Sequence, residues 1–275
     1  MRFFVVFILS CLLKITGTHA QVNRIEHFFA SSPKAEKLFN FFSKDLGLPV
    51  LWNYQTWGDF SSGGVTLGNV AFEFVNYKGA DTTSFNGIAL EPTHAMEAFE
   101  KELDKFGIAH DTIDNSNVLK DSTGALRGWS LFTPKGVLPN EANLFVCDYK
   151  NRERVADNRK KGSDKLKEIN GGGLGVISLK EIVVGTSDVK KYDQQLQKFP
   201  DIRKTNDLFS FKEGPGLRLQ QSSKNGILKI VVAIRSLKNA KTFLESKKLL
   251  GKVNAGSIFI LAEAIDGLQI ELVEG

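Results

Sequence analysis

The chain has 275 residues, of which 42% are hydrophobic and 24% are charged. This length is enough for one large or two ordinary domains, and the composition excludes a disordered chain. The formal net charge of +5 is only moderately basic, so charge alone does not indicate an acidic partner such as a nucleic acid.

Residues 1–20 have the pattern of a secretory signal peptide. Arg2 supplies a short positive start, residues 3–13 form an apolar run, and Ala20 ends a small-residue cleavage site. We expect cleavage before Gln21 and a secreted or periplasmic protein without a membrane anchor, because the apolar run is too short to span a bilayer. Lipoprotein processing at Cys11 is the alternative.

A strand, an amphipathic helix and further strands recur four times along the rest of the chain. In unit one we expect strand 25–30, a helix from Pro33 to Leu46, and strands 50–57, 64–67 and 70–77; in unit two, strand 87–90, a helix from Thr93, and strands 128–133 and 143–149. In unit three we expect strand 179–185 and a helix over 189–199; in unit four, strand 228–234, a helix over 237–244, and strands 257–262 and 268–273. Four copies of one unit predict a repeat protein.

A single unit of this kind leaves one face of its sheet bare, and pairing two units closes that face. We therefore predict an α+β fold in which βαβββ units pair into cup-shaped sheets, unit one with two and unit three with four. Consecutive pairing is favoured over units one and three facing each other. The expected organisation is a signal peptide (1–20), a first pair (21–149), a charged linker with a glycine hinge (150–175) and a second pair (176–275).

The linker segment 151–168 is dense in charges of both signs and is followed by three glycines from Gly171. A basic patch for nucleic acid is one interpretation. Interleaved acidic residues favour the other, a solvated helix followed by a flexible break. We expect no nucleic-acid partner and no membrane contact after signal cleavage.

Glu26 and His27 stand side by side in the first strand, where successive side chains point to opposite faces. In strand 70–77, Phe72 and Phe74 make the bulkier face. If that face supports the helix, His27 and Glu73 both point into the cup and Glu26 points away from it.

An imidazole and a carboxylate that converge in this way suit one divalent metal, such as Zn, Fe or Mn. Asp148, on the last strand of unit two, is the candidate third ligand. A buried hydrogen bond between His27 and Glu73 without a metal explains the same two residues, so both interpretations stay open.

Several motifs resemble the vicinal oxygen chelate superfamily, which includes glyoxalases, bleomycin-resistance proteins and extradiol dioxygenases, and especially its glyoxalase-like members. The motifs are IEH at 25–27, LFNFFSKDLGLP at 38–49, LGNVAFEF at 67–74, GALRGWSL at 124–131 and the glycine run before EIVVGT at 181–186. Their order extends over nearly all of residues 24–275.

The resemblance implies metal ligands on the first and last strands of each unit. His27 and Glu73 match these positions, and Glu181 and Glu271 match them more weakly. Gln220 would be the counterpart of Glu73 in unit three. Lys229 could pair with Glu181 and withdraw it from a metal.

Two functions follow from the resemblance. The first is a metal-dependent lyase, isomerase or dioxygenase-type enzyme that acts on a small oxygen-rich substrate. The second is a protein of the same fold that binds and sequesters a small molecule without turnover. The oligomeric state is left open.

Two further features concern the cup. Trp52 and Tyr54 share a face of their strand and could form a wall against a planar ligand, although ordinary core aromatics are the alternative. Cys147 is the one cysteine beyond the signal segment, so it cannot form an intrachain disulfide. We expect it to be a small buried residue.

Overall fold

The structure is a computed structural model that describes residues 22–199 and 202–275; the expected signal peptide and its cleavage site lie outside them. The first half contains β1 (Val22–Ser31), α1 (Ala35–Asn40) continued by a π-helical turn (Phe41–Asp45), β2 (Val50–Trp57), β3 (Phe60–Thr66), β4 (Ala71–Tyr77), β5 (Ser84–Pro92), α2 (Met96–Lys105), β6 (Val118–Lys120), β7 (Leu126–Phe132) and β8 (Leu144–Tyr149).

A long helix, α3 (Arg152–Glu168), joins this half to the second. The second half contains β9 (Val176–Thr186), α4 (Val189–Lys198), β10 (Arg203–Thr205), β11 (Leu208–Ser210), β12 (Gly216–Gln221), β13 (Gly226–Ile234), α5 (Leu237–Ser246), β14 (Leu250–Asn254), β15 (Ser257–Ile260) and β16 (Ile270–Glu274). In the described part of the chain, no helix is long and apolar enough to cross a membrane.

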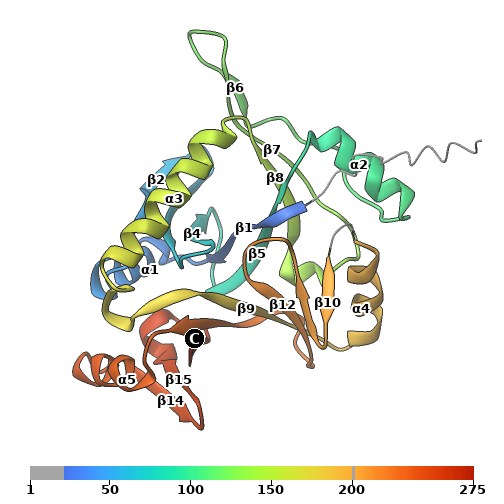
Figure 1. Cartoon of the computed structure of the whole chain (residues 1–275). Coiled ribbons are helices and arrows are strands. Elements are labelled where there is room, and N and C mark those ends of the chain that lie inside the picture. Colours follow the sequence, from blue (N-terminus) through green and yellow to red (C-terminus); the bar gives the residue numbers. More distant parts are fainter. Residues whose placement is uncertain (1–21, 200–201) are drawn as a thin grey trace, which may run out of the picture.

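The strands form two eight-stranded sheets (Figure 1). Their orders are β2-β3-β4-β1-β5-β8-β7-β6 and β10-β11-β12-β9-β13-β16-β15-β14. Each sheet combines two consecutive βαβββ units. The predicted α+β fold and the consecutive pairing of the four units are therefore confirmed.

The first strand of the chain lies at the centre of the first sheet, parallel to β4 and antiparallel to β5. Phe28 of β1 stacks on Phe72 of β4 with 4.5 Å between the ring centroids. Phe42, just after α1, contacts both Phe72 and Phe74. These bulky faces support the helix, as predicted, and the alternate positions of β4 look into the cup.

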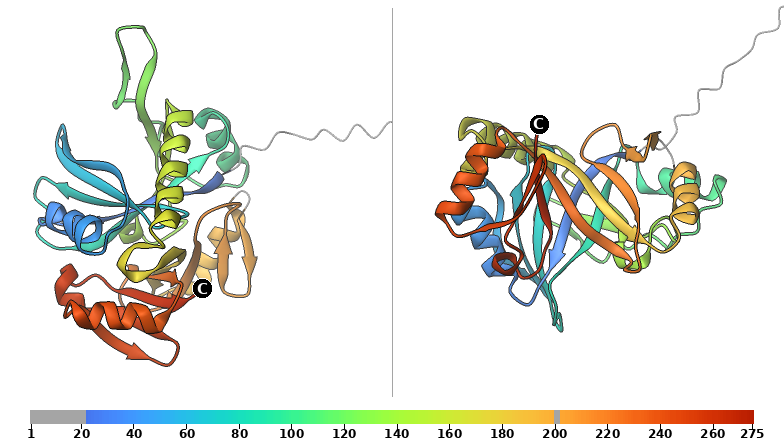
Figure 2. Two further views of the ribbon diagram at one scale, coloured as in Figure 1. Left: turned by 60° about the vertical axis from the view of Figure 1, so that its left-hand side comes forward. Right: turned by 90° about the horizontal axis from the view of Figure 1, so that it is seen from below.

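The two halves lie against each other (Figure 2). Their buried apolar side chains form one continuous core. The Asn69 side chain donates to the carbonyl of Leu179 at 2.9 Å and accepts from its N–H at 3.0 Å. The glycine run, expected as a hinge, forms a 3-10 turn (Gly172–Leu174), and the Gly173 N–H donates to the Leu46 carbonyl at 3.0 Å. The connecting segment is thus held against the first half.

The charged segment expected as a solvated linker helix forms α3, which runs along the first sheet (Figures 1 and 2). Gly162 is buried in this contact. A Cβ there would lie 2.4 Å from the Leu51 side chain of β2 and 3.6 Å from that of Thr66 in β3. Glycine lets the helix approach the strands closely, so α3 forms one wall of the first half rather than a free linker.

Candidate functional site

A cavity of about 390 Å³ lies between the concave face of the first sheet and α3. This volume is typical of small-molecule sites. Val155 and Asn158 of α3 close one side. Eight aromatic residues line it: Phe29, Trp52, Trp57, Phe60, Tyr77, Trp129, Phe145 and Tyr149. The cavity is therefore mostly apolar.

His27 and Glu73 converge in this cavity, as the alternation argument predicts. His27 Nε2 lies 3.5 Å from Glu73 Oε2, and both side chains are largely buried. The residues paired with His27 on the two neighbouring strands are Ala71 and Ala89. These small side chains leave space around the imidazole, so its Nε2 edge borders the cavity.

The expectation that Glu26 points away from the cup is wrong. Its carboxylate contacts His27 Nδ1 and lines the same cavity. The cause is a bulge in β1: Ile25 pairs with Leu90 and His27 with Ala89, so Glu26 is an extra residue without a partner in β5. A bulge re-aims a side chain locally and here brings an acid to the histidine beside it.

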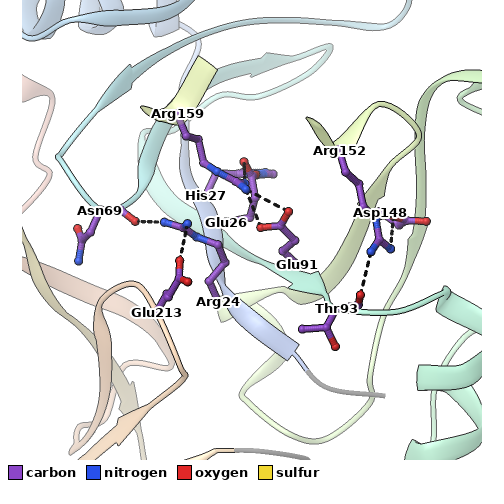
Figure 3. A network of polar contacts seen from close by, with 10 residues as sticks. All are labelled: Arg24, Glu26, His27, Asn69, Glu91, Thr93, Asp148, Arg152, Arg159 and Glu213. Carbon is purple, nitrogen blue, oxygen red and sulfur yellow. Dashed lines mark hydrogen bonds and ion pairs between the residues drawn. The ribbon is translucent and has the colours of Figure 1, made fainter. Parts of the chain in front are cut away.

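A second cation, Arg159 of α3, reaches the other oxygen of Glu26 (Figure 3). Arg159 Nη1 lies 3.1 Å from Glu26 Oε1, and Nη2 lies 2.9 Å from Glu91 Oε2 of β5. None of these three side chains is more than 14% exposed. One guanidinium thus joins the helical wall to two strands through two buried carboxylates.

These contacts shift the pKa values of His27, Glu26 and Glu73. Burial lowers the pKa of His27, but the Glu26 and Glu73 carboxylates outweigh it and raise the pKa above its ordinary value of 6.5. Burial raises the pKa of Glu26, but His27 and Arg159 outweigh it and hold that pKa below its ordinary value. For Glu73, burial prevails and its pKa is raised. The cluster therefore favours an imidazolium that can donate a proton from Nε2 to Glu73 or to a ligand.

We expect a matching pH dependence of stability. Because the folded-state pKa of His27 is raised, its contribution is fully present below about pH 6.5, the unfolded value, and is lost as the pH rises through the folded pKa. The melting temperature of the wild type should exceed that of His27→Gln most at about pH 6, and the difference should shrink towards about pH 9. Exposed His94→Gln is the control. A difference that stays constant or grows with pH would contradict this.

Asp148, expected as a third metal ligand, does not line the cavity. Its carboxylate accepts from Arg152 Nε at 2.7 Å and from Lys150 Nζ at 3.1 Å. Arg152 also donates to the Thr93 carbonyl at 3.2 Å (Figure 3). Asp148 therefore anchors the start of α3 to the end of β8.

The donor set does not fit a three-ligand centre for Zn, Fe or Mn. In unit two, the residue of β5 that pairs with His27 is Ala89. Cys147 lies two residues after the β8 partner of Ala89, just as Glu73 lies two residues after Ala71, the β4 partner of His27. Neither position of unit two therefore carries a histidine or a carboxylate. Among the described residues, no group of three or more His, Cys, Asp or Glu side chains is placed to hold a metal. His27 and Glu73 stand as a pair.

The second sheet repeats the geometry with different chemistry. Glu181 of β9 stands at the register position that His27 has in β1. A bulge at Lys180 precedes Glu181, just as the bulge at Glu26 precedes His27. Both halves therefore have this bulge in their first strand, whereas the pair of a carboxylate and an imidazole, Glu26 and His27, occurs in the first half.

Both candidate ligands of the second sheet are paired with cations. Glu181 Oε2 lies 2.5 Å from Arg218 Nε, and Glu271 Oε2 lies 2.6 Å from Lys229 Nζ. Lys229 thus pairs with Glu271 and not with Glu181 as expected. Arg218, rather than Gln220, is the register counterpart of Glu73.

The two aromatic candidates of β2, Trp52 and Tyr54, lie on opposite sides of the sheet. Trp52 lines the cavity, where Gly64 of β3 leaves room for its ring. Tyr54 packs towards α1, with 6.1 Å between its ring centroid and that of Phe39. A register shift between Trp52 and Gln55 breaks the alternation of this strand, so the expectation of a shared face does not hold.

Sequence reasoning missed the role of α3 in the site. The sequence feature that could have indicated this role is a set of residues at helical spacing that face one side of an otherwise charged helix. The set consists of Val155, Arg159, Gly162 and Leu166. Val155 and Arg159 line the cavity, and the other two are buried. A buried arginine inside such a set is typical of an ion pair beneath a helix.

No family model matches the chain, and no curated protein matches it. Solved structures do. An extradiol ring-cleaving dioxygenase from B. fuscum has a TM-score of 0.59 at 12% identity, over 94% of this chain and 73% of the other. Homoprotocatechuate 2,3-dioxygenase from Arthrobacter globiformis has a TM-score of 0.57 at 12% identity, over 94% and 81%. A hypothetical protein from Staphylococcus aureus has a TM-score of 0.60 at 9% identity, over 93% and 100%. At these identities the similarity concerns the fold alone, and at that level it confirms the resemblance expected from the sequence.

Proposed function

We propose that this chain, whose fold is that of the vicinal oxygen chelate superfamily, binds a small, largely apolar organic molecule in the cavity of its first half. The observation that carries the proposal is an aromatic-lined cavity of about 390 Å³ into which Glu26, His27, Glu73 and Arg159 converge. Apolar walls with a few fixed polar groups are the usual design of such sites. Export of the protein, supported by the pattern of residues 1–20, is part of the same proposal.

The test is a screen of small aromatic compounds by thermal shift. Ligands should raise the melting temperature of the wild type, since a ligand that binds the folded state stabilises it. Ala71→Leu should abolish these shifts, because Ala71 lines the cavity beside His27 and a larger side chain fills that space. A cavity that retains its ligands after this substitution would contradict the assignment of the site.

A metal-dependent enzyme of the dioxygenase, lyase or isomerase type is the second candidate. Two observations favour it. Two of the similar solved structures are dioxygenases, and Glu26 binds His27 Nδ1, which leaves Nε2 directed at Glu73. A carboxylate on the far nitrogen is common for histidines that bind metals. The small donor set, which consists of His27 and Glu73, argues against this second candidate.

Metal content separates the two candidates. Protein purified without chelator and analysed by elemental mass spectrometry should contain no stoichiometric Zn, Fe or Mn if the binding proposal holds. Stoichiometric metal that is lost in both His27→Ala and Glu73→Gln, but kept in Glu271→Gln, would establish the second candidate instead. Glu271 is the matched control because it is a partly buried carboxylate of the other sheet.

A further inference from the structure

Glu73 is the carboxylate of the cavity with room for a ligand. Both oxygens of Glu26 have cationic partners, His27 on one and Arg159 on the other. Glu73 has a hydrogen bond from Ser62 and the charge of His27, but the Nε2 to Oε2 distance of 3.5 Å is beyond normal hydrogen-bond length. The Glu73 carboxylate can therefore accept a further donor from the cavity.

Direct contacts compensate the two carboxylates that line the cavity unequally. Glu26 pairs with both Arg159 and His27, whereas Glu73 has one cation beside it, His27 at 3.5 Å. Arg24, which pairs with Glu213 at 2.9 Å (Figure 3), does not line the cavity, and neither does Glu91. Glu73 is therefore the lining carboxylate whose charge is less compensated.

Acidic groups that line the cavity are kept in their neutral forms, first by burial and then by these carboxylates. Burial, followed by the charge of Glu73, raises the pKa of Tyr77 to about 12. Burial, followed by the charge of Glu26, also raises the pKa of both Cys147 and Tyr149 well above their ordinary values. A ligand that carries a negative charge would meet the same burial and the same carboxylates.

The aromatic walls suit a positive charge. Trp57 and Trp129 meet edge to face with 6.5 Å between centroids, and Trp129 meets Tyr149 in the same way at 6.4 Å. Phe60 tilts against Tyr77 at 5.8 Å. Rings set at steep angles expose faces, whose negative quadrupole attracts a cation most strongly where water is excluded.

We infer that the ligand of this cavity is an organic monocation, a protonated amine on an aromatic or hydrocarbon body, whose N–H groups bind Glu73 and whose body lies among the aromatic rings. This inference rests on the proposed function and names its ligand class. The ammonium group would donate to the Glu73 carboxylate, which His27 approaches only to 3.5 Å.

Three probes of nearly equal shape test the charge: benzylamine, benzyl alcohol and benzoate at neutral pH. All three tryptophans of the chain line the cavity, so quenching of tryptophan fluorescence reports binding there. Benzylamine should bind at least about tenfold more tightly than benzyl alcohol, and benzoate should bind most weakly. Glu73→Gln should remove the advantage of the amine, and Glu271→Gln should leave it intact.

The comparison of the three probes on the wild type decides the matter even if Glu73→Gln fails to fold. Benzyl alcohol equal to benzylamine, or benzoate tighter than either, overturns the inference and leaves the small-molecule site standing. Absence of binding by all three at millimolar concentration overturns both. An amine advantage that survives Glu73→Gln in a folded protein overturns the role of Glu73 and with it the inference.

Discussion

Arg159→Met should lower the free energy of unfolding by about 3 kcal/mol, because removing one partner of a buried ion pair strands the others. Here one guanidinium pairs with both Glu26 and Glu91, and its side chain is 14% exposed. Methionine keeps most of the aliphatic stem, so packing is largely preserved. Urea denaturation at neutral pH measures the loss.

Arg154→Met is the matched control, since Arg154 lies on the same helix with an exposed side chain. We expect a change within about 0.5 kcal/mol there. The double variant Arg159→Met with Glu26→Gln should lose less than the sum of the two single losses, because the stranded carboxylate is gone. Similar small losses for Arg159 and Arg154 would mean that α3 is not tied to the sheet through Arg159.

Glu26→Gln should cost about 2–3 kcal/mol and lower the pKa of His27. Glu26 provides charge-assisted hydrogen bonds to two cations, and such bonds contribute about 1.5–3 kcal/mol. Burial then acts on His27 with only Glu73 to oppose it. Urea denaturation gives the first quantity, and an NMR titration of the His27 ring gives the second.

The control for this change is Glu181→Gln, at the register position of His27 in the second sheet. Its partner Arg218 is 37% exposed, so we expect a loss of about 1 kcal/mol or less. An unchanged His27 titration in Glu26→Gln would show that the carboxylate beside it does not set its proton affinity. The bulge would then be a backbone irregularity without a chemical role.

The fold could be predicted because its signals are repeated and local. Four units each present a strand, an amphipathic helix and further strands, and consecutive units pair as connection rules favour. The inward direction of Glu73 followed from the bulk of Phe72 and Phe74 on the opposite face. Period-two alternation holds in β4, so that deduction was sound.

The missed parts of the site trace to breaks in that same alternation. One extra residue at Glu26 and one register shift near Tyr54 each move a side chain to the face opposite the expected one. A bulge depends on how two strands pair across a distance of many residues. Neither Glu26 nor Tyr54 has a neighbour, such as glycine, that would mark a bulge locally.

The burial of Arg159 could not be predicted for another reason. Its helix carries charges of both signs, and its exposed faces form i,i+4 pairs such as Lys160 with Asp164 at 2.7 Å. A solvated helix has the same composition. Only the tertiary position of α3, fixed by the close approach at Gly162, shows that one of these charges is buried.

The helical wall has a consequence for how the chain can be divided. The strands of the first cup end at Tyr149, yet the residue that pairs with two of its buried carboxylates comes ten positions later, in the connecting helix. A fragment cut at the apparent module boundary would lose the Arg159 partner of Glu91 and would leave Glu26 with His27 alone. Any fragment or exchanged half that contains the first cup must therefore extend through Glu168, so that α3 stays with it.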